Sequence, residues 1–127
     1  MEWSFRSDLP IYSQLVEQIK LAIVSGVFSP GERLASVRDM ATEAGVNPNT
    51  MQRALQELER EGIVFSLRTS GRFVTEDQPV IDAAKKSFAG EQIRAFLSAM
   101  QKLGYRGEEI ISLITESIKE ENNGLDT

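Results

Sequence analysis

The chain of 127 residues contains no cysteine and no histidine. Without cysteine it has no disulfides or thiolate zinc sites, and without histidine it lacks an imidazole ligand and the commonest general base. It also has no Walker loop and no G-x-G-x-x-G motif. No apolar run approaches the roughly 18 residues that span a bilayer, and no basic, apolar leader is present. These absences predict a soluble, cytoplasmic protein that is not an enzyme and needs no metal or cofactor.

An excess of basic residues is also missing, because the net charge is −5. A basic domain is the usual footprint of a nucleic-acid-binding protein, so the overall charge argues against one. The distribution of charge matters more than its sum. From Ala44 to Gln56 the only charged residue is Arg53, and from Gly62 to Thr75 the only ones are Arg68 and Arg72. Carboxylates are therefore absent from two stretches in which phosphates could be bound.

The chain has 41% hydrophobic residues, enough for one core with a smaller appendage. Apolar residues recur at helical spacing in three early segments, and a strand pattern with a glycine-containing turn follows them. The expected elements are helices over 11–25, 37–44 and 48–61, a strand over 63–68, a turn over 69–71 and a returning strand over 72–74. This order predicts three helices and a β-hairpin, or wing.

Two capping signals fix the starts of the second and third helices. Ser36 precedes the second helix, and Asp39 lies three residues later, where a carboxylate favours the helix dipole. Gly45 ends that helix. Asn47 and Pro48 then form a cap and a first helical residue. The two helices are thus joined by a tight turn, which predicts a helix-turn-helix.

The third helix is expected to bury one face and to expose a polar one. A helix that reads the major groove of DNA needs side chains that can form hydrogen bonds with base edges. The exposed face carries four such side chains: Asn49, Gln52, Arg53 and Gln56. Cations that could grip the phosphate backbone flank this helix, at Arg38, Arg68 and Arg72. For Arg53 a second interpretation is equally open, an ion pair with Glu57 at i+4.

Gln78 and Pro79 are typical of a boundary, and two more helices are expected after them, separated by Gly104 to Gly107. A two-helix hairpin buries little apolar surface alone, so it should pack on a second copy or on the first domain. The tail from Asn122 to Thr127 is expected to fray. The apolar residues expected at a dimer interface are Phe88, Ile93, Phe96, Leu97, Met100, Ile110, Ile111, Ile114 and Ile118.

The stretch from Pro10 to Val74 resembles the N-terminal DNA-binding domain of the GntR family of bacterial transcription regulators. The resemblance covers about half of the chain. It rests on Pro10, Tyr12 and Gln14, followed in order by SGVFSPGERLASVRDMA, GVNPNTMQRALQELEREGIV and SGRFV. It implies a mainly α fold with a small β wing, in which a winged helix-turn-helix domain (1–77) precedes a helical dimerisation domain (78–127). It also implies binding of a double-stranded DNA operator as a homodimer.

In that family, the arginine at the start of the second helix and the first residues of the third contact DNA, while the wing tip reaches the minor groove. Two departures occur here: Ala35 replaces a common proline, and Thr69 replaces a wing glycine, where a positive φ would disfavour a β-branched residue. The residue types and the resemblance together predict a DNA-binding set of Ser36, Arg38, Asn47, Pro48, Asn49, Thr50, Gln52, Arg53, Arg68, Ser70, Gly71 and Arg72.

The short C-terminal part resembles that of the YtrA-like subgroup, in which it mediates dimerisation. The subgroup implies a repressor more than an activator, an inverted-repeat operator and control of an ABC transporter operon. A small-molecule effector is a further possibility. One alternative of a different class is a protein-binding winged helix that acts as an adaptor or antirepressor, which the acidic balance would suit.

Overall fold

The computed structural model describes residues 1–125, which form two compact units, Met1–Ser87 and a second unit that starts at Phe88. The first unit extends ten residues past the expected boundary at residue 77, since Ile81 is buried in it. Each unit is described below by itself.

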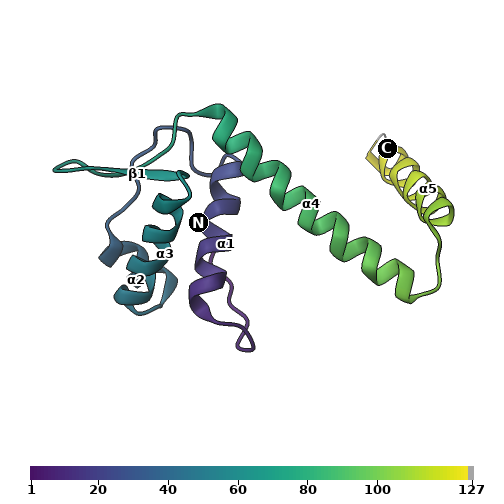
Figure 1. Ribbon diagram of the computed structural model, residues 1–127, viewed down its shortest axis with the longest axis horizontal. Helices are drawn as coiled ribbons and strands as arrows, with labels where there is room; N and C mark the ends of the chain where they lie inside the picture. The colour runs from purple at the N-terminus through teal and green to yellow at the C-terminus, as the bar shows by residue number, and fades with distance from the viewer. Residues whose placement is uncertain (126–127) are drawn as a thin grey trace. The chain divides into compact units, whose positions relative to one another are not determined.

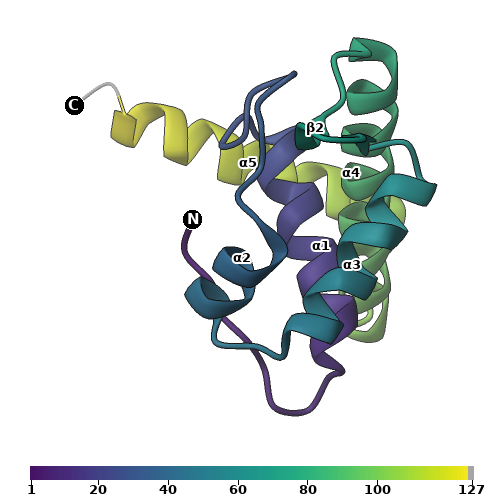
Figure 2. The same cartoon turned by 90° about the vertical axis from the view of Figure 1, so that its left-hand side faces the viewer.

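Three helices form the body of the first unit: α1 (Ile11–Val24), α2 (Val37–Ala44) and α3 (Pro48–Arg60). They lie within a residue or so of the predicted ranges. The third helix, α3, contacts both α1 and α2 (Figure 1 and Figure 2). Its apolar stripe faces inward, because residues three and four apart lie on one face of a helix. The buried side chains shared by the three helices are Leu15, Ile19, Ile23, Met40, Ala41, Met51, Ala54, Leu55 and Leu58.

Both predicted caps are present in the structure. The Ser36 hydroxyl accepts a hydrogen bond from the Asp39 N–H at 3.1 Å, and the Asn47 side-chain amide oxygen, Oδ1, accepts one from the Asn49 N–H at 2.8 Å. Gly45 ends α2 with a φ of 71°. These local bonds satisfy backbone groups that a helix end leaves unpaired, and they therefore set where α3 begins.

Replacing Asn47 by alanine should lower the free energy of unfolding by about 1 kcal/mol, because the Asn49 N–H loses its acceptor. Urea denaturation of the two proteins measures this difference. Asn49→Ala is the matched control, since the Asn49 side chain is exposed and caps nothing. Equal losses for the two variants would contradict the capping role.

The wing consists of β1 (Val64–Leu67) and β2 (Gly71–Val74), an antiparallel pair. Phe65 lies opposite Phe73 in the register, and their rings stack with centroids 5.7 Å apart. The chain before α2 adds to the free edge of β2, because the Leu34 N–H donates to the Arg72 carbonyl oxygen at 2.9 Å. The wing is thereby joined to the segment that leads into the helix-turn-helix.

An extended N-terminal arm lies against α1 and α2. Trp3 stacks on Phe5, and its indole N–H donates to Glu43 of α2 at 3.3 Å. The buried Gln14 amide of α1 holds the same arm, because it accepts from the Arg6 N–H at 2.7 Å and donates to the Arg6 carbonyl at 2.8 Å. The arm therefore joins α1 to α2.

The second unit contains most of α4 (Gln78–Lys102) and α5 (Gly107–Leu125), and α5 doubles back after the turn at 103–106 (Figure 1). Ile110 is buried in it, whereas Ile93, Ile111 and Ile118 are more than half exposed. The tail was expected to fray from Asn122, and α5 extends to Leu125; Asp126 and Thr127 lie outside the described residues. Within residues 1–125, none of the helices combines the length and apolarity needed to cross a membrane.

An apolar groove of about 400 Å³ lies between α4 and α5, within the second unit. We call it the hairpin groove. Two of its side chains come from α4 and five from α5. They are Phe96, Met100, Leu113, Ile114, Ser117, Ile118 and Glu121.

Candidate nucleic-acid interface

The outward face of α3 is polar and open. Asn49, Arg53 and Gln56 are exposed, and Thr50 and Gln52 are half-buried. The first turn of α3 contains no acidic residue. The positive end of its dipole is therefore not neutralised by a neighbouring carboxylate, and the amide side chains beside it can pair with base edges.

The Arg53 side chain is held against α1. Its guanidinium carbon lies 4.8 Å from the centre of the Tyr12 ring, which is the geometry of a cation–π contact. The alternative partner, Glu57, pairs with Arg60, whose Nε donates to the carboxylate at 2.7 Å. That hydrogen bond is the main cause that lowers the pKa of the Glu57 carboxyl. Between the two interpretations of Arg53, the structure thus favours an exposed cation seated on Tyr12.

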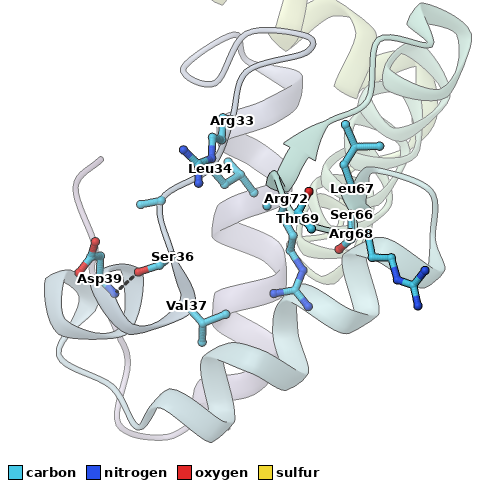
Figure 3. A pocket seen from close by; sticks show the side chains of 12 residues that line it. Arg33, Leu34, Ser36, Val37, Asp39, Ser66, Leu67, Arg68, Thr69 and Arg72 are labelled. Carbon is cyan, nitrogen blue, oxygen red and sulfur yellow. Dashed lines mark hydrogen bonds between the residues drawn. The ribbon is translucent and has the colours of Figure 1, made fainter.

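A groove of about 840 Å³ lies between the start of α2 and the wing, and we call it the wing groove (Figure 3). Three arginines line it, Arg33, Arg68 and Arg72, against one carboxylate, Asp39. Ser36, the cap of α2, lines it as well. Among the predicted site residues, the structure therefore brings the α2 cap and the wing cations together in one basic groove, in a protein that is acidic overall.

The two wing arginines have different surroundings. Arg68 is exposed at the hairpin turn, whereas the Arg72 side chain is only 17% exposed and extends to α3. The Arg72 Nε lies 3.5 Å from the Glu59 carboxylate, and its Nη1 donates to the Gln52 amide oxygen at 3.4 Å. Figure 3 shows the Arg68 guanidinium directed away from that of Arg72. Of the two, Arg68 is the more available to a phosphate.

The threonine that departs from the family pattern does not strain the wing. In the described residues every positive φ belongs to a glycine, and the one in the wing is Gly71, with a φ of 107°. A Cβ atom at Gly71 would also lie 3.1 Å from the Arg33 Nε. The left-handed position of the turn is thus at Gly71, two residues after Thr69, and Thr69 keeps a backbone conformation that suits it.

Arg33 and Glu59 were not among the predicted site residues. Arg33 enters the wing groove because its segment pairs with β2, through a bridge to Phe73. Glu59 accepts a hydrogen bond from the Ser66 hydroxyl and pairs with Arg72. The basic character of Arg33, just before the predicted cap, was the available signal for the first residue. The role of Glu59 depends on contacts with the wing that helical periodicity does not reveal.

A helix-turn-helix with a wing, an open polar α3 and a basic groove defines a winged-helix DNA-binding protein. The sequence profile of the bacterial regulatory proteins of the gntR family matches residues 11–74. The chain belongs to the GntR family. It is a DNA-binding transcription regulator and has no enzymatic role.

Two relatives from Bacillus subtilis match most of the chain. The uncharacterised transcriptional regulator YhcF is 40% identical over 87% of this chain and 92% of its own. The transcriptional repressor YtrA is 36% identical over 87% of this chain and 86% of its own. The similarity thus extends beyond the winged domain into the second unit.

Two solved structures are similar to this one. A GntR family regulator from Listeria monocytogenes has a TM-score of 0.82 and 39% identity, over 88% of this chain and 98% of its own. The DNA-binding domain of AraR, solved in complex with operator ORX1, has a TM-score of 0.54 and 26% identity, over 59% of this chain and 96% of its own. The AraR structure shows a similar fold bound to operator DNA.

Proposed function

We propose that this protein is a repressor that recognises a specific operator with α3 and grips the neighbouring phosphates with its α2 start and wing. The observation that carries this proposal is the basic wing groove beside the carboxylate-free start of α3. The similarity to the repressor YtrA and to the operator-bound AraR domain supports it. Such a regulator acts on chromosomal DNA, so we also propose that it works in the cytoplasm.

The roles within the interface follow from side-chain chemistry. Contacts with phosphates do not read sequence, whereas hydrogen bonds to base edges do, and amides and hydroxyls are suited to the second kind. We assign the base-reading role to residues in the first two turns of α3: Asn49, Thr50 and Gln52. We assign backbone contacts to the helix starts, to the cations and to the wing tip: Ser36, Arg38, Asn47, Pro48, Arg53, Arg68, Ser70 and Gly71. Arg33 joins the second group because it lines the wing groove.

Replacing Arg38 by alanine should weaken binding to all DNA sequences by a similar factor. Arg38 is exposed in the first turn of α2, where its charge can neutralise one phosphate and release its counterion. The slope of log affinity against log salt should therefore fall in magnitude by about one. Titrations of operator and random DNA at several salt concentrations measure both effects.

Lys85→Ala is the control for Arg38→Ala, because Lys85 is an exposed cation on α4, away from the helix-turn-helix in sequence. It should leave the salt slope unchanged. An unchanged slope for Arg38→Ala would exclude the phosphate contact, and a loss confined to the operator would make Arg38 a base reader.

We further propose that the second unit makes the protein a homodimer. Large apolar side chains are exposed on both of its helices, among them Ile93, Phe96, Ile111 and Ile118, and the hairpin groove lies between those helices. A second copy of the same unit would cover these side chains and bury them from water. Ile110 is buried already and contributes to the hairpin itself.

Two-fold symmetry of such a dimer would set two copies of α3 about one turn of DNA apart, roughly 34 Å, on an inverted-repeat operator. The resemblance to YtrA-like regulators supports a transporter operon as the target. Deletion of the gene should then raise transcription of an operon that has such a repeat before it. A deletion that changes no transcript would contradict repression.

A further inference from the structure

Arg72 makes contacts that a phosphate-binding cation does not need. Its Nη1 donates to the Gln52 amide oxygen at 3.4 Å. A guanidinium has only donors, so the atom that faces it must be the oxygen of the amide and not its nitrogen. The contact therefore distinguishes the two ends of the Gln52 side chain, which are otherwise almost equal in size.

The wing holds Arg72 in this position. Ser66 lies opposite Arg72 in the register of β1 and β2, and both side chains converge on the Glu59 carboxylate of α3. The Arg72 side chain is 17% exposed, and its Nε is buried beside Glu59 without a hydrogen bond of its own. The ion pair at 3.5 Å is thus its main electrostatic restraint. Because Arg72 is mostly shielded from water, this pairing is screened less than a surface one and holds the guanidinium on the α3 side of the wing.

Gln52 is half-buried on the face of α3 assigned above to base reading. A free glutamine amide can turn over and present either its oxygen or its nitrogen to a base. With the oxygen engaged by Arg72, the group left to face DNA is the N–H₂, which donates. Guanine, adenine and thymine each offer an acceptor in the major groove, whereas cytosine offers only a donor.

We propose that Arg72 is a specificity-determining positioning residue, which fixes the Gln52 amide so that it prefers an acceptor-bearing base over cytosine. The inference rests on the proposed function, because it requires that α3 read sequence. It assigns Arg72 an action through Gln52 and Glu59, in place of a direct phosphate contact.

The experiment uses the full-length protein and DNA selected by it from a random library. Titrations with Gln52→Ala first identify the base pair that Gln52 reads. At that pair, a change of base alters the affinity of wild type but not that of Gln52→Ala. Four duplexes that differ at this pair are then titrated with wild type, Arg72→Met, Arg72→Lys and Arg68→Met, each at several salt concentrations. Arg68→Met is the matched control, since Arg68 lies on the same hairpin but is exposed.

We expect wild type to prefer the best acceptor-bearing base over cytosine by about tenfold or more. Arg72→Met should reduce this ratio to about threefold or less and leave the salt slope unchanged, while Arg72→Lys, which also only donates, should keep part of the preference. Arg68→Met should do the reverse, with the preference kept and the slope lowered by about one. Adding Gln52→Ala to Arg72→Met should change the ratio no further.

Two results would overturn the inference while the proposed function stands: an unchanged base preference in Arg72→Met, or uniform weakening with a lower salt slope, which would make Arg72 a phosphate contact. If circular dichroism shows that Arg72→Met has unfolded, the same base preference is measured for Glu59→Ala and tests the inference in its place. It releases Arg72 and removes a negative charge, so the preference should fall without loss of overall affinity. If wild type enriches no sequence from the library, sequence-specific binding itself fails, and this inference with it.

Discussion

Replacing Ile114 by glutamate is expected to convert the protein to a monomer and to lower its affinity for a two-half-site operator by about 100-fold or more. Ile114 lines the hairpin groove and is 37% exposed in a single chain. A carboxylate is therefore tolerated there in the monomer, since it still reaches water. In the proposed dimer the same carboxylate would be buried without a partner, and such burial is strongly unfavourable.

The loss of operator affinity has a simple physical origin. In a dimer, binding of one half-site brings the second winged domain close to the other half-site, so the second event occurs at a high effective concentration. A monomer binds each half-site independently. Light scattering measures the mass of each protein, and titrations with one-half-site and two-half-site DNA separate dimerisation from intrinsic recognition.

Ser112→Glu is the matched control for Ile114→Glu. It adds the same charge to the same helix, but it lies two residues earlier, about 200° around α5, and does not line the groove. It should remain dimeric and keep operator affinity within about threefold, apart from the general effect of one added charge. A dimeric Ile114→Glu with normal operator affinity would place the interface elsewhere.

Replacing Leu58 by alanine should lower the free energy of unfolding of the winged domain by about 2–5 kcal/mol. Leu58 is fully buried in α3. The loss combines the transfer of its side chain out of water with the cavity that remains after it is removed. Small domains are stable by only about 5–15 kcal/mol in total. On heating, Leu58→Ala should therefore lose DNA binding at a lower temperature than the wild-type protein does.

Leu21→Ala makes the same chemical change at a position that is 51% exposed, and it should cost less than about 1 kcal/mol. Urea denaturation followed by circular dichroism compares the two variants. Similar losses would mean that Leu58 is not part of a well-packed core. Binding at low temperature, where both variants are folded, should stay close to wild type, because neither side chain faces DNA in the proposed complex.

The helices of the winged domain were predictable because the forces that define them are local. The α2 start depends on a bond between Ser36 and a residue three positions later, and the α3 start depends on Asn47 and Pro48. The apolar stripe of α3 follows from helical spacing, so its buried and exposed faces could be read as well. The family resemblance added the expectation that the exposed face binds DNA, and membership of the GntR family is confirmed.

The contacts that organise the interface could not be read in this way, since they join residues far apart in the chain. Helical spacing allowed Arg53 either to pair with Glu57 or to face outward. In the structure its guanidinium lies over the Tyr12 ring of α1. Thr69 suggested a strained wing tip, whereas the positive φ belongs to Gly71. Arg72 has the charge expected of a phosphate contact, yet its side chain lies against α3.

The sequence by itself determined where each helix begins, which face of α3 is polar and where carboxylates are absent. These properties depend on hydrogen bonds and spacings within a few residues. The tertiary structure alone decided which cations are free and which are engaged. Pairing of the two strands carries Arg72 to α3, 13 residues from Glu59 and 20 from Gln52 in sequence, and packing there fixes an orientation that no local rule encodes.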